Sequence, residues 1–400
     1  MLRVLYFTII AQRDGAPNNG GFLNTRTNIL RLKQDDNIEL AVVIAAPENT
    51  RTPTVSFLTD VGVDKFLFIP VDDRRRPHRP RDRLKLRWIK RAGVYWESLA
   101  LTHPEVKQLV SEALTRWESD FLVIDYLFSA LFCPELDTLK LPAAIITLNR
   151  EAEFYRDCVA QRVFRHGPLR AAIMGSRLAR FERNAYRQSA KVIAIGQPDV
   201  PSYLSPSQAS CITPYLDEQA EPWRFTDSKT AFFVGNISHY PNRMAIEFIA
   251  KSLAPRVAAR RDDVRIKIVG VDGAGVPAEW RHPIISYLGV SDASTVRALF
   301  QTADLQLCPI ANDFGMKFKV AESAAYGTPF LASFETAKCV PYLADLPKIE
   351  LSDHETAADA ACDIIGNRAK LESLSALIRA RHRTFAASQK NIWSRTLSGP

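Results

Sequence analysis

The feature that most constrains the fold is a repeated alternation of short apolar runs with helical stretches. In the first half of the chain, apolar runs occur at residues 2–10, 39–45, 121–126 and 143–148. Continuous apolar runs of this length are typical of strands buried on both faces, and strands that alternate with helices predict a parallel sheet. Because 400 residues are too many for one ordinary core, we expect two such domains.

The polar stretch 217–230 is the strongest candidate for an unstructured linker, and it divides the chain nearly in half. A second series of strands is predicted after it, at 231–235, 264–270, 284–289, 304–309, 330–333 and 349–352. We therefore predict an α/β chain of two Rossmann-like domains, 1–218 and 229–385, facing each other across a cleft. This architecture is used for nucleotide-linked substrates.

Several classes of protein are disfavoured. No apolar run reaches the ~18 residues needed to span a bilayer. Residues 2–10 lack a signal-peptide cleavage site, so we interpret them as a first strand. The six cysteines are scattered without a Cys-x-x-Cys pair, which favours reduced thiols, a cytoplasmic location and no zinc site.

Positive charge is concentrated in two stretches. Residues 72–91 contain ten Lys/Arg against three Asp, and 164–187 interleave six Arg with apolar residues at helical spacing. Such stretches attract phosphates, so an anionic membrane surface is a candidate partner and a peripheral location at the inner membrane a candidate location. The alternatives are a solvated loop and an ordinary helix with its arginines in water. No nucleic-acid-binding motif accompanies them, so no nucleic-acid partner is expected.

Polar residues follow the predicted strands of the first half where ligands bind in this fold. A glycine loop at 15–21 precedes a helix, and its Gly20 and Gly21 allow close approach of backbone to a bound group, although many such turns are glycine-rich merely to turn. Asn149 and Glu151 crowd the exit of a later strand and are candidate site residues. The alternative is that one of them caps the following helix.

The stretch 308–330 contains a strand end, a polar loop and a helix start with Lys317, Lys319 and Glu322. A helix start offers free N–H groups and a positive dipole end, which suit a diphosphate, and the two lysines add positive charge. Glu322 lies one turn beyond Lys319, where its carboxylate is placed to accept hydrogen bonds from a ribose diol. The alternative is an ordinary strand–helix unit with a solvated charged face.

The second half of the chain resembles the C-terminal domain of GT-B glycosyltransferases, particularly the large retaining family 4, also called glycosyl transferases group 1. The segments that carry the resemblance are Phe233-Val-Gly-Asn236, Tyr240-Pro-Asn242 and the run from Gly315 to Pro329. The first half is similar more loosely, at Gly20-Gly21 with Arg26, Leu148-Asn149-Arg150-Glu151 and Phe181-Glu182-Arg183. Asn391-Ile-Trp393 resembles the last helix of that fold, so we expect a helix at about 386–400 to cross back to the first domain.

The resemblance implies an acceptor-binding first domain, a second domain that binds a nucleotide-sugar donor, and transfer with retention of anomeric configuration. Lys317 is then expected to bind phosphate, Glu322 to bind ribose and Lys319 to give structural support. The expected catalytic residues are Lys317, Glu151 and Asn149, and the expected donor-binding residues are Gly235, Asn236, Gly315, Met316, Lys317, Lys319 and Glu322. Because the sequence contains no Asp-x-Asp motif, we expect no metal and no other cofactor.

Three residues depart from the family pattern. Phe314 stands where the family often has a second acid, Leu148 where it often has a histidine, and Asn236 where it often has an arginine. The expected function is a metal-independent glycosyltransferase acting on a glycan or lipid-linked acceptor, in surface polysaccharide or glycolipid synthesis. The alternatives are a GT-B-fold epimerase of the nucleotide sugar and an inactive scaffold that binds a partner or a membrane.

Overall fold

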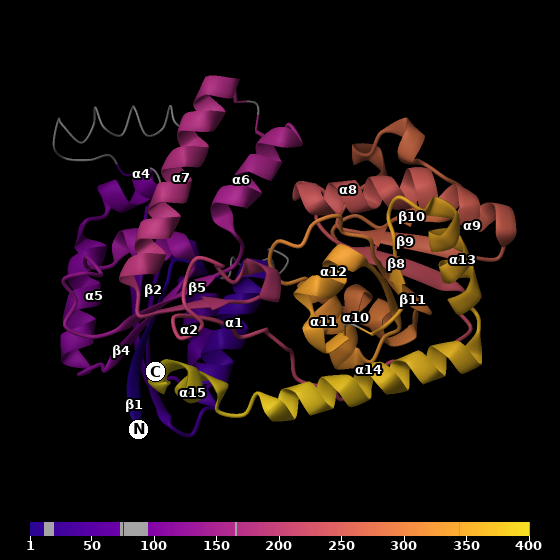
Figure 1. Ribbon diagram of the computed structural model, residues 1–400. Helices are drawn as coiled ribbons and strands as arrows, with labels where there is room; N and C mark the ends of the chain where they lie inside the picture. Colours follow the sequence, from indigo (N-terminus) through magenta and orange to yellow (C-terminus); the bar gives the residue numbers. More distant parts are fainter. Residues whose placement is uncertain (12–19, 73–74, 76–94, 165, 344, 400) are drawn as a thin grey trace. The chain divides into compact units, whose positions relative to one another are not determined.

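A computed structural model describes residues 1–11, 20–72, 75, 95–164, 166–343 and 345–399 (Figure 1). Its internal contacts separate the chain into two compact units. The first unit comprises Met1–Thr213 together with Lys390–Pro400, and the second unit comprises Pro214–Gln389. Apart from Asp72 and the residue at 75, the basic stretch expected at 72–91 lies outside the described residues.

The first unit is built on a seven-stranded sheet in the order β3-β2-β1-β4-β5-β6-β7, and all of its strand pairs are parallel. Its strands are β1 (Leu2–Thr8), β2 (Ile38–Ala46), β3 (Lys65–Pro70), β4 (Phe121–Asp125), β5 (Ala143–Thr147), β6 (Lys191–Ala194) and β7 (Ala209–Cys211). The α-helices described are α1 (Gly20–Lys33), α2 (Arg51–Asp60), α4 (Tyr95–Thr102), α5 (Glu105–Arg116), α6 (Glu151–Ala160), α7 (Pro168–Gln188) and α15 (Ile392–Ser398).

The second unit repeats the same plan with a six-stranded parallel sheet in the order β10-β9-β8-β11-β12-β13. Its strands are β8 (Thr230–Val234), β9 (Arg265–Val269), β10 (Ile285–Tyr287), β11 (Leu305–Cys308), β12 (Phe330–Ser333) and β13 (Lys348–Ile349). Its α-helices are α8 (Tyr240–Phe248), α9 (Ala254–Arg260), α10 (Ala293–Thr302), α11 (Phe318–Tyr326), α12 (Phe334–Cys339), α13 (His354–Ile364) and α14 (Arg368–Ser388).

The predicted α/β class of two Rossmann-like units is confirmed by these sheets. The central strands are apolar because helices cover both faces, and every residue of β4 and β5 is buried. Two helical predictions differ in detail: the region 93–116 is broken at His103 and Pro104, and the helix expected from 164 begins at Pro168. Proline accounts for both starts, because its fixed φ suits the first turn of a helix.

The stretch 217–230 is an ordered part of the second unit, which differs from the unstructured linker predicted from its polarity. Trp223 is buried, and its indole Nε1 donates to the carbonyl of Ala303 at 2.7 Å. The backbone N–H groups of Gln219 and Trp223 donate to the carbonyls of Ala325 and Tyr326, at 2.9 and 2.8 Å. One buried aromatic residue therefore fixes a segment whose other residues are mostly polar.

The last residues of the chain pack into the first unit. Trp393 of α15 is almost fully buried, and the backbone N–H of Ser394 donates to Asp35 Oδ2 at 2.8 Å. α15 is separated from α14 by a break at which Asn391 adopts a left-handed φ of 53°. The chain thus returns to its first unit after the second is complete. None of the helices within the described ranges is long and apolar enough to cross a membrane.

A left-handed glycine ends the helix that follows the candidate phosphate site. Gly327 caps α11 with a φ of 75°, and a Cβ atom there would lie 2.5 Å from Cγ of Arg379. The next residue, Thr328, is fully buried, and its hydroxyl donates to the carbonyl of Phe300 at 2.5 Å. Glycine is required at this turn because only glycine adopts a left-handed conformation without strain.

We predict that Gly327→Ala lowers the free energy of unfolding by roughly 1–3 kcal/mol, because the substitution adds backbone strain and a contact with Arg379. Gly275→Ala is the matched control, since no atom lies within 4 Å of the added methyl group there. Urea denaturation of both variants measures the difference. Equal midpoints for the two variants would contradict the prediction.

Candidate functional site

The candidate site of the second unit lies at the carboxyl ends of its strands. β8 is flanked by β9 on one side and by β11 on the other, so the strand order reverses there. Ligands of doubly wound sheets bind outside the carboxyl ends of the strands at such a reversal. The loops that leave β8 and β11 contain most of the residues predicted to bind a donor.

Glycines bring the ends of β8, β9 and β10 close together. A Cβ atom on Gly270 would lie 2.4 Å from the carbonyl oxygen of Gly235, and Gly270 has a φ of 101°. The N–H of Gly235 donates to the carbonyl of Val269 at 2.9 Å, and that of Gly270 to the carbonyl of Gly289 at 2.8 Å. The backbone after β8 is thereby held close to the backbone at the ends of β9 and β10.

Asn242, in the first turn of α8, links two of the predicted donor-binding residues. Its side-chain Nδ2 donates to the carbonyl of Asn236 at 3.1 Å, and its Oδ1 accepts from Nζ of Lys319 at 2.7 Å. The Asn242 amide fills the space beside Gly235, where a Cβ atom would come within 2.7 Å of it. Lys319 Nζ also lies 4.3 Å from the ring centre of Phe233, in a cation–π contact.

Through these contacts Lys319 links α11 to α8. Burial lowers the pKa of Lys319 to about 8, and the nearby charge of Lys317 adds to the decrease. The expected division of labour, with Lys319 as structural support, fits this arrangement. The sequence indicated Asn242 only as part of the Tyr240-Pro-Asn242 segment, and its contacts were not predicted, because its partners lie six and 77 residues away.

Lys317 precedes α11 as its N-cap residue and is buried. Its ammonium group donates to Asn312 Oδ1 at 3.2 Å and to the carbonyls of Phe314 and Gly315. Asn312 Nδ2 donates in turn to the hydroxyl of Tyr240 at 3.0 Å. The loop after β11 therefore wraps around the Lys317 ammonium, and Asn312 ties this loop to α8.

The neighbours of Lys317 complete the helix start. Gly315 has a left-handed φ of 66°, and Met316 is buried beside it. Lys317 has no side-chain capping bond. Within the described residues, the first turn of α11 therefore combines a lysine ammonium with a helix start that no N-cap side chain closes.

Two further titratable groups share the electrostatic field of the lysines. Burial raises the pKa of Glu322 to about 7, and Lys319 acts in the opposite direction. Desolvation, followed by the charges of Lys319 and Lys317, lowers the pKa of His239 to about 4. The direction of this shift favours the neutral imidazole of His239, which can both donate and accept hydrogen bonds. Its position was missed from the sequence, in which it is one of seven dispersed histidines.

In the first unit, Asn149 and Glu151 are brought into direct contact at the end of β5. Asn149 Nδ2 donates to Glu151 Oε1 at 3.1 Å, and Thr147 Oγ1 donates to the carbonyl of Asn149 at 2.6 Å. Burial raises the pKa of Glu151 to about 8, the bond from Asn149 opposes this rise, and Glu182 and Asp199 add to it. Glu151 is consequently a mostly protonated acid at pH 7.

Neither Asn149 nor Glu151 caps the helix that begins there. Glu182 of α7 does so instead, because its two carboxylate oxygens accept from the backbone N–H groups of Glu151 and Ala152, each at 3.1 Å. The N–H of Arg150 donates to Asp199 Oδ1 at 3.2 Å. The start of α6 is therefore held by carboxylates of the protein itself, which sequence spacing did not reveal.

Asp125 ends β4 beside Thr8 of β1, at the strand reversal of the first sheet. Its carboxylate accepts from Thr8 Oγ1 at 3.1 Å, from Asn24 Nδ2 at 3.2 Å and from Thr25 Oγ1. Burial raises the pKa of Asp125 to about 6, although these bonds limit the increase. A fully buried acid with three internal donors ties α1 to the sheet.

The glycine loop is described only where it enters α1. Gly20 and Gly21 are the first two residues of that helix, and residues 12–19 lie outside the described ranges. Arg26 lies on the exposed side of α1 and stacks over the ring of Phe57 at 4.9 Å. Its guanidinium therefore contributes to packing between α1 and α2.

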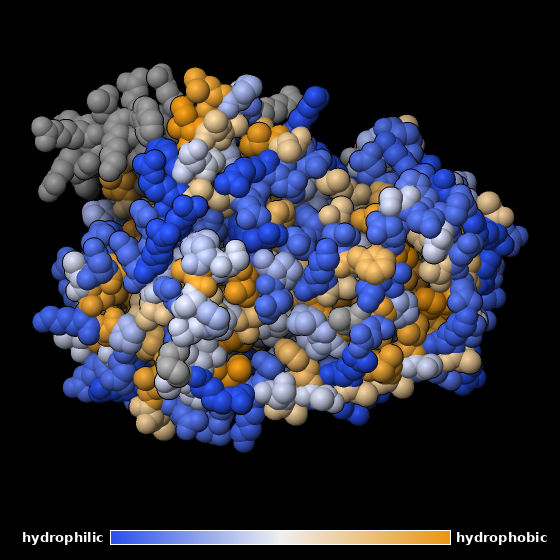
Figure 2. All heavy atoms as spheres, viewed as in Figure 1, coloured by the Kyte–Doolittle hydropathy of each residue, from blue (hydrophilic) through white to orange (hydrophobic). Residues whose placement is uncertain are grey.

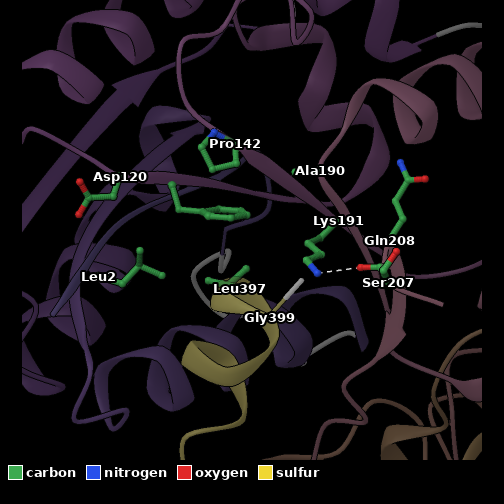
Figure 3. Close-up of a pocket in the computed structure, with 10 residues that line it drawn as sticks. Leu2, Asp120, Pro142, Ala190, Lys191, Ser207, Gln208, Leu397 and Gly399 are labelled. Carbon is green, nitrogen blue, oxygen red and sulfur yellow. Dashed lines mark hydrogen bonds between the residues drawn. The ribbon is translucent and has the colours of Figure 1, made fainter. Parts of the chain in front are cut away.

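The cavity of about 490 Å³ shown in Figure 3 lies at the opposite edge of the first sheet. It is lined by residues at or just before the amino ends of the strands and by Leu397 and Gly399 of the C-terminal segment. Lys191 Nζ already donates to the carbonyl of Ser207 at 2.7 Å there. Since ligands of this fold bind at the carboxyl edge, we do not assign the chemistry to this cavity. No group of three His, Cys, Asp or Glu able to hold a metal ion occurs in the described part of the chain.

Comparisons with known proteins agree on the fold. Residues 228–379 match the family model for glycosyl transferases group 1. No curated protein sequence matches the chain.

Solved structures are similar over the whole chain at low identity. HepE from Anabaena in complex with UDP and glucose has a TM-score of 0.61 at 12% identity, covering 100% of both chains. A mutant of TarM from S. aureus, in complex with fondaparinux, alpha-GlcNAc-glycerol and UDP, has a TM-score of 0.66 at 9% identity, also covering 100% of both chains. A protein from Listeria monocytogenes described as a putative UDP-N-acetylglucosamine 2-epimerase has a TM-score of 0.50 at 11% identity, covering 98% of both chains.

We predict that ionisation of Glu151 destabilises the folded state as pH rises. Its folded pKa is raised to about 8, so above pH ~4.3 the folded state holds a proton that the unfolded chain has lost, and stability falls until pH 8 is passed. Glu151→Gln removes the ionisable group and with it this pH-dependent loss of stability. Between pH 5.5 and 8.5, the free energy of unfolding of the variant is therefore expected to rise by roughly 2–3 kcal/mol relative to that of wild type.

Urea unfolding across this pH range measures the gain. Glu153→Gln is the matched control, because Glu153 is about half exposed and pairs with Arg150 at the surface. If the free energy of unfolding of Glu151→Gln changed with pH as that of wild type does, Glu151 would not be the group that holds the buried proton.

Proposed function

We propose that the chain is a glycosyltransferase that transfers a sugar from a nucleotide-sugar donor to a glycan or lipid-linked acceptor. The match of residues 228–379 to the glycosyl transferases group 1 model and the fold shared with HepE and TarM support this proposal. The observation that carries the proposal is the start of α11, where Lys317, Lys319 and Glu322 gather at the strand reversal of the second unit. The pathway that this activity would serve is surface polysaccharide or glycolipid synthesis.

The second unit would bind the donor. Lys317 would exchange the oxygens of its own loop for those of the diphosphate, and the amides at the start of α11 would face the same group. Asn236 and Gly235 would present backbone to it, and Glu322 would accept hydrogen bonds from the ribose hydroxyls. Lys319 would hold α8 and α11 in register through Asn242.

The chemistry follows from the charge that develops as the bond between sugar and diphosphate breaks. Negative charge grows on the leaving phosphate, and a preorganised lysine ammonium and helix-start amides stabilise it. Lys317 is the N-cap residue of α11, so its ammonium and the helix-start amides are placed together before the bond breaks. We propose that no metal ion is needed and that the acceptor hydroxyl attacks from the leaving-group face, with retention of configuration.

The first unit would supply the acceptor side. Asn149 and Glu151 lie at the carboxyl edge of its sheet and form one hydrogen-bonded pair. Since Glu151 is mostly protonated at pH 7, we infer that this pair orients a sugar hydroxyl rather than removing its proton. A cytoplasmic location and an anionic membrane surface that presents a lipid-linked acceptor complete the proposal.

We predict that Lys317→Ala lowers kcat roughly 10²–10³-fold, because it removes a cation that acts on charge formed in the transition state. Glu322→Gln is expected to raise KM for the donor by roughly tenfold, since it weakens hydrogen bonds made equally in ground and transition states. The donor is first identified by thermal shift across UDP-, GDP- and ADP-sugars.

Steady-state kinetics with that donor then measures both variants. Lys338→Ala, an exposed lysine of α12, is the control and should retain wild-type rates. Thermal unfolding of each variant separates lost catalysis from lost folding. Normal donor turnover by folded Lys317→Ala would exclude the proposed phosphate role.

Metal independence is tested by chelation. We expect the enzyme to keep its transfer rate within about twofold after treatment with EDTA, and added Mg²⁺ or Mn²⁺ to change it no more than that, because the proposed stabilising charges belong to the protein. Loss of activity on chelation, restored by a divalent ion, would contradict this part of the proposal.

Product analysis with and without acceptor distinguishes the alternatives. Transfer predicts an acceptor-dependent glycoside with the anomeric configuration of the donor, read by nuclear magnetic resonance. An altered sugar nucleotide formed without acceptor would indicate an epimerase. The absence of nucleotide binding in calorimetry across the same donors would favour a scaffold.

A further inference from the structure

The end where α6 and α7 meet exposes an unusual set of apolar side chains. Leu169 is 76% exposed, Ile173 is 47% exposed and Phe164 is 41% exposed. Leu169 and Ile173 are four residues apart in α7, so they lie on one face of its first two turns. Figure 2 shows apolar side chains gathered at this end, at the top of the view, where Figure 1 places the ends of α6 and α7.

This apolar tip, defined as Phe164, Leu169 and Ile173, is held in place by packing beneath it. Tyr155 of α6 stacks on Phe164 at 5.7 Å between ring centres, and its hydroxyl is 2.9 Å from Nδ1 of His166. Gly175 of α7 brings its backbone against the ring of Tyr155, where a Cβ atom would be in van der Waals contact. The exposed side chains therefore project from a structured support.

Positive charge predominates around the tip, and the nearest acid before it in the sequence is Asp157 of α6. Residues 158–181 contain no Asp or Glu and five Arg. Arg162, Arg170 and Arg180 are exposed. Glu182, the next acid in the sequence, is engaged with the start of α6. A partner that contacts this end therefore meets an apolar surface bordered by positive charge.

Along α7, Arg170 lies between the two apolar residues of the tip, and a further exposed arginine, Arg180, follows them. Leu169 and Ile173 occupy the first two turns, and Arg180 lies on the same exposed side about 10 Å further along the axis from Ile173, at 1.5 Å per residue. Interfacial helices bury apolar side chains about 5–10 Å into the boundary between headgroups and acyl chains. With α7 entering the interface by its N-terminal end, Arg180 would lie about 10 Å from the apolar residues along the membrane normal, at the level of the phosphates.

We propose that this tip docks on an anionic lipid surface, with Phe164, Leu169 and Ile173 entering the interface and Arg162, Arg170 and Arg180 facing lipid phosphates. The docking itself does not depend on the proposed function. Its role, to bring the enzyme to a lipid-linked acceptor, does rest on that function. The exposed apolar area supplies part of the affinity and the arginines select for negative charge, so both are needed for stable binding.

Co-sedimentation of the full chain with vesicles tests the proposal, using phosphatidylcholine alone and phosphatidylcholine with about one third phosphatidylglycerol. We expect binding to the anionic vesicles at about 0.05 M salt and much weaker binding at about 0.5 M, because salt screens the arginines. The double variant Leu169→Ser with Ile173→Ser should lose roughly tenfold or more in affinity. Arg170→Gln with Arg180→Gln should lose a similar factor at low salt only.

Two matched controls keep the result specific. Leu288→Ser with Val290→Ser removes two exposed apolar side chains of the second unit, and Arg368→Gln removes a surface charge there. Both should bind vesicles like wild type. All variants should keep wild-type donor turnover with a soluble acceptor, so that failure of docking is distinguished from failure of the proposed activity.

Three results would overturn the proposal. The first is no binding to anionic vesicles at either salt concentration. The second is unchanged binding by the Leu169/Ile173 double variant. The third is concentration-dependent self-association that this variant abolishes while vesicle binding is absent, which would assign the tip to a second copy of the chain.

Discussion

The geometry of the second unit depends on one side chain placed beside one glycine. Asn242 occupies the space that a side chain at position 235 would take, and from there its amide reaches both the backbone after β8 and the ammonium of Lys319. A buried ammonium is tolerated only where acceptors and an aromatic face replace water. Here the Asn242 oxygen and the Phe233 ring do so. The position of α11, and with it of Lys317 and Glu322, follows from this contact.

The two units place opposite charges at equivalent points of the same topology. The reversal between β1 and β4 contains the carboxyl group of Asp125, surrounded by hydroxyl and amide donors. The reversal between β8 and β11 has the ammonium of Lys319 packed on Phe233 of β8. Burial moves both pKa values toward neutrality. The fold thus provides a scaffold of parallel strands, and the residues at the reversal decide which ionisable group is buried there.

A feature of the fold or of the site could be predicted from the sequence when the residues that determine it are close together in the chain. The strands followed from continuous apolar runs, since burial on both faces leaves a local signature, and the start of α11 followed from adjacent residues. Three contacts could not be predicted in this way, namely those of Trp223, Glu182 and Asn242. Each of these residues contacts a partner between 6 and 80 positions away, and none belongs to a periodic pattern. Their roles required knowing which elements the topology places side by side. The polarity of 217–230 was misleading because one buried indole outweighed its polar neighbours.

The return of the chain to its first unit has a consequence for how the protein is made. Trp393 and Leu397 fill part of the core of a unit whose other residues end at Thr213. During synthesis, therefore, the first Rossmann-like unit leaves the ribosome lacking a piece of its interior, while the second unit is contiguous and able to finish first. The order in which the cores close is then the reverse of the order in which the units are translated. The core of the first unit is completed by a short helix encoded almost two hundred residues later.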